Sequence, residues 1–221
     1  MLLKSEQQRA RKIFDILKKQ YPKVKPALEY SNPFELLIST ILSAQCTDAR
    51  VNIVTKQLFK KYKTPKDFID VNIDELEKDI FSTGFYRQKA KNIKGCCEEL
   101  ITTHKGKVPA NFDELVKLPG VGRKTASVVA GNAFGIPAIA VDTHVKRLSN
   151  LLGFIDSQNQ DNIELKLKEL LPNNYWINSS HWLATHGRII CIANRPKCSE
   201  CVLADICPSF NPLNNKKKKK L

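Results

Sequence analysis

Apolar residues recur at intervals of three and four positions along most of this chain, which is the spacing of one face of an α-helix. The clearest run consists of Phe34, Leu37, Ile38, Ile41 and Leu42. Few stretches alternate between apolar and polar residues, and the apolar segment at 136–141 is too short to form a sheet. The pattern predicts an all-α fold with roughly ten helices.

Capping residues and helix breakers divide this pattern into separate helices. Asp48, Thr64-Pro65 and Asn72 can start helices, and Gly84, Gly106 and Gly135 can end them. The predicted helices cover residues 33–45, 48–62, 65 onward, 73–82, 86–103, 113–118, 123–133, 143–152, 162–171 and 181–192. A Gly/Pro-rich stretch near Pro137 interrupts two helical patterns and predicts a boundary between domains.

The composition is that of a globular protein with a basic surface. Among 221 residues, 42% are hydrophobic and 26% are charged, and the formal net charge is +14. Five positive charges form the run Lys216–Lys220, and the remainder is still basic. Such a surplus favours a polyanionic partner, most often nucleic acid. The less favoured alternative is that the charge serves solubility or reflects a genome rich in Lys codons.

No stretch reaches the ~18 apolar residues that a membrane-spanning helix needs. After Leu2 and Leu3 the chain becomes charged, so the start does not resemble a secretory signal. We therefore expect a cytoplasmic protein with no membrane partner. In such a reducing compartment, the four cysteines between residues 191 and 207 suggest a metal centre rather than disulfides.

Residues 113–130 read DELVKLPGVGRKTASVVA, which predicts two helices joined by a tight turn. Gly120 and Gly122 lack a Cβ, so the backbone can adopt positive φ and approach another surface closely. The free N–H groups at the start of the second helix can then hold a phosphate. The alternative is a tight corner without a ligand. Arg123 and Lys124 favour a ligand, because cations at a helix start oppose its dipole.

Lys124 has a second possible role. If its side chain is partly buried beside Lys117 and Arg123, its charged form is disfavoured, and a neutral amine can form a Schiff base with a sugar carbon. Taken alone, the motif favours the simpler interpretation, in which Lys124 is one more phosphate contact.

The segment VDTH at 141–144 opens another predicted helix. Asp142 is well placed as its N-cap. A carboxylate held in this way also stays oriented and could stabilise positive charge on a sugar ring or move a proton. His144 could contact phosphate or simply pack against a neighbouring helix.

The cysteines at the carboxyl end follow the pattern C-x6-C-x2-C-x5-C and are Cys191, Cys198, Cys201 and Cys207. Four thiolates suit either tetrahedral zinc or a [4Fe-4S] cluster, and the spacing does not decide between them. Cys46, Cys96 and Cys97 lie far away in the sequence and are interpreted as small core or surface residues.

The order of LPGVGRK, VDTH and the cysteine pattern resembles that of the endonuclease III family of helix-hairpin-helix DNA glycosylases with AP lyase activity. LLISTILSAQCTD at 36–48 and GFYRQKA at 84–90 belong to the same resemblance, which covers about Ser5 to Pro208. It implies two α-helical lobes with DNA bound between them, and a [4Fe-4S] cluster rather than zinc. The six-helix lobe would cover 26–136, with the helix-hairpin-helix at about 112–131. Residues 1–25 and 137–210 would form the iron–sulfur lobe. The tail 211–221 is not part of the family pattern, and its polar and then purely Lys composition predicts that it is disordered.

The resemblance also implies roles for individual residues. Lys124 would be the nucleophile and Asp142 the catalytic carboxylate. Gln45 would fill the space left by an extruded base, and Phe85 would be a wedge where relatives often have Leu. The other implied DNA contacts are Gly120, Val121, Gly122, His144 and Arg195. The four cysteines named above would hold the cluster.

The implied function is base excision repair of damaged double-stranded DNA by a monomer in a bacterial-type cytoplasm, associated with the nucleoid. The enzyme would remove oxidised pyrimidines through a lysine Schiff base and cleave the strand 3′ to the abasic site by β-elimination. Two alternatives remain. One is a monofunctional mismatch glycosylase, whose members generally lack a lysine at position 124 and have a longer C-terminal domain. The other is a non-catalytic DNA-binding module with structural zinc.

Overall fold

The computed structural model describes residues 2–210, and within that range the regular structure is entirely helical. The all-α prediction is confirmed, with eleven α-helices and three short 3-10 helices in the described range. The α-helices are α1 (Leu2–Gln20), α2 (Pro33–Leu42), α3 (Asp48–Lys61), α4 (Pro65–Asp70), α5 (Ile73–Ile80), α6 (Tyr86–His104), α7 (Phe112–Lys117), α8 (Arg123–Phe134), α9 (Thr143–Leu151), α10 (Gln160–Leu170) and α11 (Asn173–Ile189). The 3-10 helices are η1 (Phe81–Thr83), η2 (Cys198–Glu200) and η3 (Ala204–Ile206). The Lys-rich tail predicted to be disordered lies outside the described residues.

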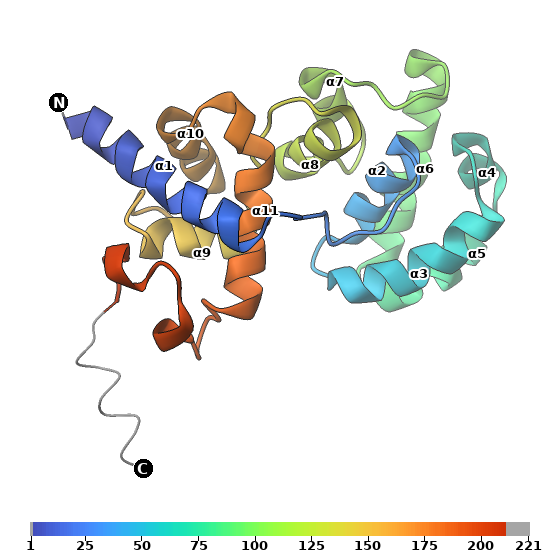
Figure 1. Cartoon of the computed structure of the whole chain (residues 1–221). Helices are drawn as coiled ribbons and strands as arrows, with labels where there is room; N and C mark the ends of the chain where they lie inside the picture. Colours follow the sequence, from blue (N-terminus) through green and yellow to red (C-terminus); the bar gives the residue numbers. More distant parts are fainter. Residues whose placement is uncertain (1, 211–221) are drawn as a thin grey trace, which may run out of the picture. The chain divides into compact units, whose positions relative to one another are not determined.

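The chain forms two units, each with its own core. One unit is Pro26–Ile136, and the other combines Met1–Lys25 with Pro137–Leu221. In the first unit α6 is the long central helix, and α2, α4 and α5 pack against it (Figure 1). In the second unit α11 packs against α1, α9 and α10.

Helix α2 is buried almost all round in the core of the unit 26–136. Asn32 caps it by accepting the N–H of Glu35, and Pro33 occupies the first turn, where its missing N–H costs nothing. Leu36, Leu37 and Ile38 are completely buried, which explains why the sequence is apolar on more than one helical face.

Helix α1 has no counterpart among the predicted helices, which begin at residue 33. Its apolar residues Ala10, Ile13, Phe14 and Leu17 nevertheless follow helical spacing, and all four are completely buried. They join the core formed by residues after 137. The first turns of the chain therefore help to build the unit that contains the four carboxyl-terminal cysteines.

One predicted N-cap and one predicted helix start differ from the structure, and another predicted cap is found as expected. Thr47, rather than Asp48, is the N-cap of α3 and accepts the N–H of Arg50. Helix α11 begins at Asn173, directly after Pro172 and well before the predicted start at 181. Thr64 forms the predicted cap of α4, with Asp67 completing a capping box.

Candidate functional site

The turn between α7 and α8 is tight because Gly120 has no side chain. Gly120 adopts φ +76°, and a Cβ there would lie 2.7 Å from Cβ of Asn92 on α6. The N–H of Val121 donates to the carbonyl of Leu118 at 3.0 Å and closes the turn. The role predicted for Gly122 needs correction: its φ is −87°, and a Cβ there would meet nothing within 4 Å. The fold of this chain therefore requires glycine at 120 but not at 122.

Helix α8 starts on the surface without a side-chain cap. Its N-cap is Gly122, whose carbonyl accepts the N–H of Ala126 at 2.9 Å. Gly122, Arg123 and Lys124 are all exposed. The N–H groups of this first turn have no carbonyl one turn earlier in the helix to bond, so the end of α8 carries positive partial charge at the surface.

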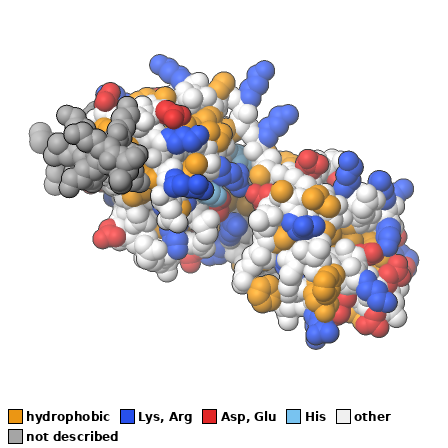
Figure 2. Space-filling view, turned by 90° about the horizontal axis from the view of Figure 1, so that it is seen from below, with side chains coloured by type: hydrophobic (Ala, Val, Ile, Leu, Met, Phe, Trp, Pro, Cys, Tyr) orange, Lys and Arg blue, Asp and Glu red, His pale blue; other side chains and the backbone are white. Residues whose placement is uncertain are grey.

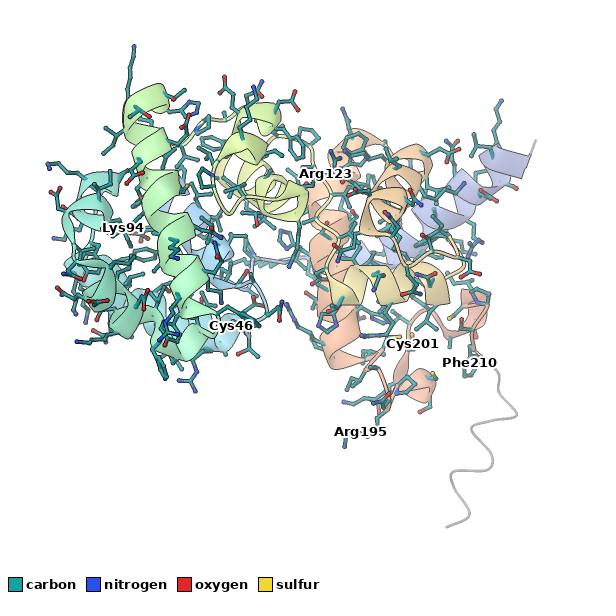
Figure 3. The ribbon with its side chains drawn as sticks, turned by 180° about the vertical axis from the view of Figure 1, so that it is seen from behind. Cys46, Lys94, Arg123, Arg195, Cys201 and Phe210 are labelled. Atoms are coloured by element: carbon teal, nitrogen blue, oxygen red, sulfur yellow. The ribbon has the colours of Figure 1, made fainter. Side chains whose placement is uncertain are left out.

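Two cationic side chains extend from this helix start. The Arg123 guanidinium lies 5.3 Å from the centre of the Phe112 ring on α7, which orients it by cation–π contact (Figure 3). Lys124 is exposed, so the condition of partial burial, under which its charged form would be disfavoured, is not met. Its amine is instead accessible to a large substrate.

Asp142 is the N-cap of α9, as predicted. Its Oδ1 accepts the N–H of Val145 at 2.7 Å, and the residue is half-buried. Oδ2 of Asp142 takes no part in this bond with Val145, and the bond to Oδ1 restricts how the carboxylate can turn. The carboxylate is thus held in one orientation by the backbone.

His181 on α11 is a neighbour of Asp142 that no sequence pattern predicts. Burial lowers the pKa of His181, the charge of Arg188 lowers it further, and the negative charge of Asp142 opposes both. The adjacent Ser180 accepts the N–H of Ala140 at 3.0 Å, which fixes α11 beside the segment that carries Asp142. No spacing or motif distinguishes His181 in the sequence, because this contact depends on how α9 and α11 pack.

His144 packs between helices. A Cβ on Gly187 of α11 would lie 3.0 Å from its Nδ1, so the absence of a side chain there makes room for the imidazole. Arg147 continues this contact by donating to the carbonyl of Gly187 at 3.0 Å and to that of Cys191 at 2.6 Å. These contacts join the start of α9 to the end of α11 and to the first of the four clustered cysteines.

Gln45 and Phe85 share an unusual backbone conformation. Gln45 has φ +53° and Phe85 has φ +48°, and both side chains are exposed, Phe85 by 66%. A left-handed conformation costs a residue with a side chain about 1–2 kcal/mol. Such conformations cluster at sites that bind or react, because the surrounding structure must be organised to maintain them.

The four carboxyl-terminal cysteines line one cavity of about 100 Å³. Its other walls are largely apolar and include Leu148, Leu152 and Leu203. Burial raises the pKa of Cys191, and the charge of Arg147 opposes this effect. Burial also raises the pKa of the Cys201 thiol, and the N–H of Leu203, 3.4 Å from its sulfur, opposes it.

His186 adds a polar group to this cavity. Its Nε2 lies 3.4 Å from the sulfur of Cys201, and its Nδ1 lies 3.0 Å from the hydroxyl of Tyr21 on the chain after α1. Within residues 2–210, no three His, Cys, Asp or Glu side chains are grouped as a single metal ion would require. Four thiols around one cavity are a donor set that suits either tetrahedral zinc or an iron–sulfur cluster.

The remaining cysteines are not grouped with these four. Cys96 and Cys97 are completely buried in the core of the unit 26–136, which confirms their interpretation as core residues. Burial raises the pKa of Cys96 to about 12. Cys46 is half-buried at the edge of the same core.

Positive charge is widespread at the surface. Lys and Arg side chains spread over the face that each unit presents in Figure 2, with hydrophobic side chains among them. Arg195 and Lys197 are exposed in the loop between the first two clustered cysteines, and Arg195 extends outward from it (Figure 3). In the described part of the chain, no helix is both long and apolar enough to cross a membrane.

Residues 38–173 match the family model of the HhH-GPD superfamily base excision DNA repair protein. This stretch contains the α7–α8 turn, Lys124 and Asp142. Fold and site thus place the chain in a class of DNA repair proteins whose common element is the helix-hairpin-helix.

Individual relatives narrow the class. The chain is 49% identical to endonuclease III of Synechocystis over 93% of this chain and 94% of the relative. It is 50% identical to endonuclease III of Bacillus subtilis over 85% of this chain and 86% of the relative. Among solved structures, a non-covalent endonuclease III–DNA complex is similar with a TM-score of 0.89 and 47% identity, covering 97% of this chain and 99% of that chain. The chain belongs to the endonuclease III family.

Proposed function

We propose that Lys124 and Asp142 carry out the reaction of this enzyme. Membership of the endonuclease III family makes the chain a DNA glycosylase with AP lyase activity that acts in base excision repair. One similar structure, with a TM-score of 0.89, is a trapped endonuclease III–DNA covalent intermediate. A covalent intermediate needs a nucleophile, and the exposed amine of Lys124 at the uncapped start of α8 is the group that best supplies one.

The amine of Lys124, once it has lost a proton, attacks C1′ of the damaged nucleotide, and the bond from C1′ to the base breaks with its electrons leaving on the base. Asp142 stabilises the positive charge that develops on the sugar and accepts a proton from the attacking nitrogen. Its bond from Val145 keeps the carboxylate oriented for both tasks.

The sugar ring then opens to give a Schiff base between Lys124 and C1′. The iminium nitrogen withdraws electrons and acidifies the proton at C2′. Loss of this proton expels the 3′ phosphate by β-elimination and cuts the strand on the 3′ side of the lesion. Water finally releases the sugar from Lys124 and regenerates the amine.

The protein must first hold DNA and expose the damaged nucleotide. We assign contacts with the DNA backbone to the turn Gly120–Gly122 and to Arg195. His144, in the first turn of α9, would lie close to a DNA phosphate. Gln45 and Phe85 enter the duplex where a base has been extruded. Oxidised pyrimidines are the expected substrates, because non-planar bases stack poorly and cost less to extrude.

Cys191, Cys198, Cys201 and Cys207 would hold a [4Fe-4S] cluster in the cavity that they line. When bound, this group supplies folding free energy to the loop between residues 191 and 207. The loop then presents Arg195 and Lys197 as a basic surface toward DNA. We expect the enzyme to act as a monomer on damaged double-stranded DNA, in a bacterial-type cytoplasm and at the nucleoid.

Borohydride trapping on a duplex that contains thymine glycol tests this assignment. Borohydride reduces a Schiff base to a stable amine, so wild-type enzyme becomes covalently linked to DNA. Lys124→Ala should abolish the linked product while retaining DNA affinity. Lys117→Ala, an exposed lysine on the other helix of the hairpin, is the matched control and should still be trapped. Trapping that persists in Lys124→Ala would show that another amine is the nucleophile.

A further inference from the structure

Lys89 is a buried lysine in the first turns of α6, with only 4% of its surface exposed. Its Nζ donates one hydrogen bond to the carbonyl of Leu42 and another to the carbonyl of Thr83, both at 2.8 Å. Lysines are rarely buried to this extent, because removing the ammonium from water is costly. Two strong bonds to backbone carbonyls compensate for part of this cost.

The two carbonyls belong to the segments that lead into Gln45 and Phe85. Leu42 is the last residue of α2, three positions before Gln45, and Thr83 ends η1, two positions before Phe85. One ammonium therefore joins both segments at their base. Burial lowers the pKa of Lys89, and the charge of Cys46, next to Gln45, opposes that effect. In Figure 3, Cys46 lies near the N-terminal end of α6, the helix that carries Lys89.

Both segments need such support. Gln45 and Phe85 hold positive φ, and Lys105 is the one other non-glycine residue with this conformation among those described. Both are also exposed, so packing of their own side chains contributes little to holding the backbone. The carbonyl of Leu42 lies at the end of a helix, where no later N–H of the helix reaches it.

We propose that Lys89 is a positioning residue that clamps the 43–45 and 83–85 segments together, so that Gln45 and Phe85 enter the duplex as one rigid pair. This inference rests on the proposed role of those two side chains in DNA. It adds a residue that touches neither DNA nor the reacting atoms and acts through the two backbone carbonyls it binds.

The clamp matters only when the enzyme has to open a base pair. Separation of stacked bases costs a few kcal/mol, and a rigid pair of inserted side chains lowers that cost by being in place beforehand. A site that is already unpaired needs little of this help. Loss of the clamp should therefore slow reaction on paired duplex DNA more than reaction on DNA that is already open.

Lys89→Met keeps the length of the side chain and removes its donors. Lys94 on the same helix provides a matched control, because its Nζ donates to the carbonyls of Ile69 and Val71, at 2.6 and 2.5 Å, in a part of the unit that carries neither inserted side chain. The measurement is the single-turnover rate of strand cleavage on two substrates, thymine glycol in a fully paired duplex and an abasic site within an unpaired bubble.

We expect Lys89→Met to slow cleavage of the paired duplex on the order of 10- to 100-fold, as for other small misplacements of positioned groups. Cleavage in the bubble should change by less than about threefold, because the opening step is absent. Lys94→Met should leave the ratio of the two rates at its wild-type value. An equal loss on both substrates, or no loss on either, would overturn the clamp.

Two further variants separate this inference from the proposed function. Phe85→Ala should change the same ratio as Lys89→Met if Phe85 enters the duplex. If Phe85→Ala leaves the ratio of the two rates unchanged, the proposed insertion of Phe85 into the duplex is wrong. If Phe85→Ala changes the ratio and Lys89→Met does not, only the clamp is wrong. Should Lys89→Met unfold at the assay temperature, Lys89→Arg retains charge and donors and should keep the ratio near wild type, while Lys89→Gln should shift it toward that of Phe85→Ala.

Discussion

Gly120 lies against Asn92 so closely that a methyl group at position 120 would be 2.7 Å from Cβ of the asparagine. The hairpin turn is thus seated directly on α6, with its backbone at φ +76°. Gly120→Ala should lower the free energy of unfolding by about 1–3 kcal/mol, because it adds both a clash and an unfavourable conformation. Urea denaturation measures the change, and a variant as stable as wild type would contradict this account of the turn.

Gly122→Ala is the matched substitution two residues further along. Its backbone is compatible with alanine, and the space around it is open, so stability should stay within about 0.5 kcal/mol of wild type. If this turn lies against a DNA backbone, the added methyl group should nevertheless weaken binding to an abasic-site analogue. Fluorescence anisotropy gives the affinity, and unchanged binding would place the DNA elsewhere.

Substitution of Asp142 separates its two roles. Asparagine also accepts the N–H of Val145, so Asp142→Asn should remain as stable as wild type, whereas Asp142→Ala should lose about 1 kcal/mol with the cap. Both should slow base release by about 100- to 10,000-fold, because each removes the charge. If Asp142→Asn releases base at a near-normal rate, the carboxylate serves only to cap α9.

The cavity lined by the four cysteines leads us to expect iron in the purified protein. Purified protein should be brown and contain four iron atoms per chain if a [4Fe-4S] cluster fills the cavity. Cys198→Ser should lose iron and become less stable, while Cys46→Ala, outside the cavity, should retain the full amount. Metal analysis by mass spectrometry decides the question, and a colourless active protein with zinc alone would rule out the cluster.

Acid should destabilise the protein partly through His181. Its pKa in the folded protein lies below the ordinary value of 6.5, so the unfolded chain binds the proton more readily. Stability is then complete above pH 6.5 and declines as the pH falls toward the pKa of the folded state. His181→Gln should flatten this decline in urea titrations at a series of pH values. His186, whose pKa burial lowers to about 4, acts in the same direction, so part of the slope should persist. An unaltered slope would mean that His181 is not responsible.

Local chemistry explains why much of the fold can be predicted from the sequence. Thr64-Pro65 and the apolar spacing of residues 34–42 each specify a helix through residues close together in the sequence. Both helices, α4 and α2, are present in the structure. The hairpin is predictable for the same reason, since LPGVG imposes the turn at Gly120. Asp142 as a cap likewise follows from its position before a helical pattern.

Long-range contacts account for what could not be predicted. Lys89 and His181 acquire their environments from α2 and α9, which are distant in sequence, and no local pattern marks them. Lys124 shows the same limit: whether its side chain is buried could not be decided from its neighbours along the chain, and the start of α8 is exposed. Helix α1 escaped prediction although its apolar residues are regularly spaced, because charged residues dominate its sequence.

The unit that holds the cysteines combines the first 25 residues of the chain with those after Ile136. During synthesis on the ribosome, α1 emerges before α10 and α11, on which it packs, so its buried face stays uncovered until they follow. The segment 26–136 can meanwhile complete its own core. The four cysteines follow the segment 26–136 in the chain, so the site that they line can be completed only after that segment has been synthesised.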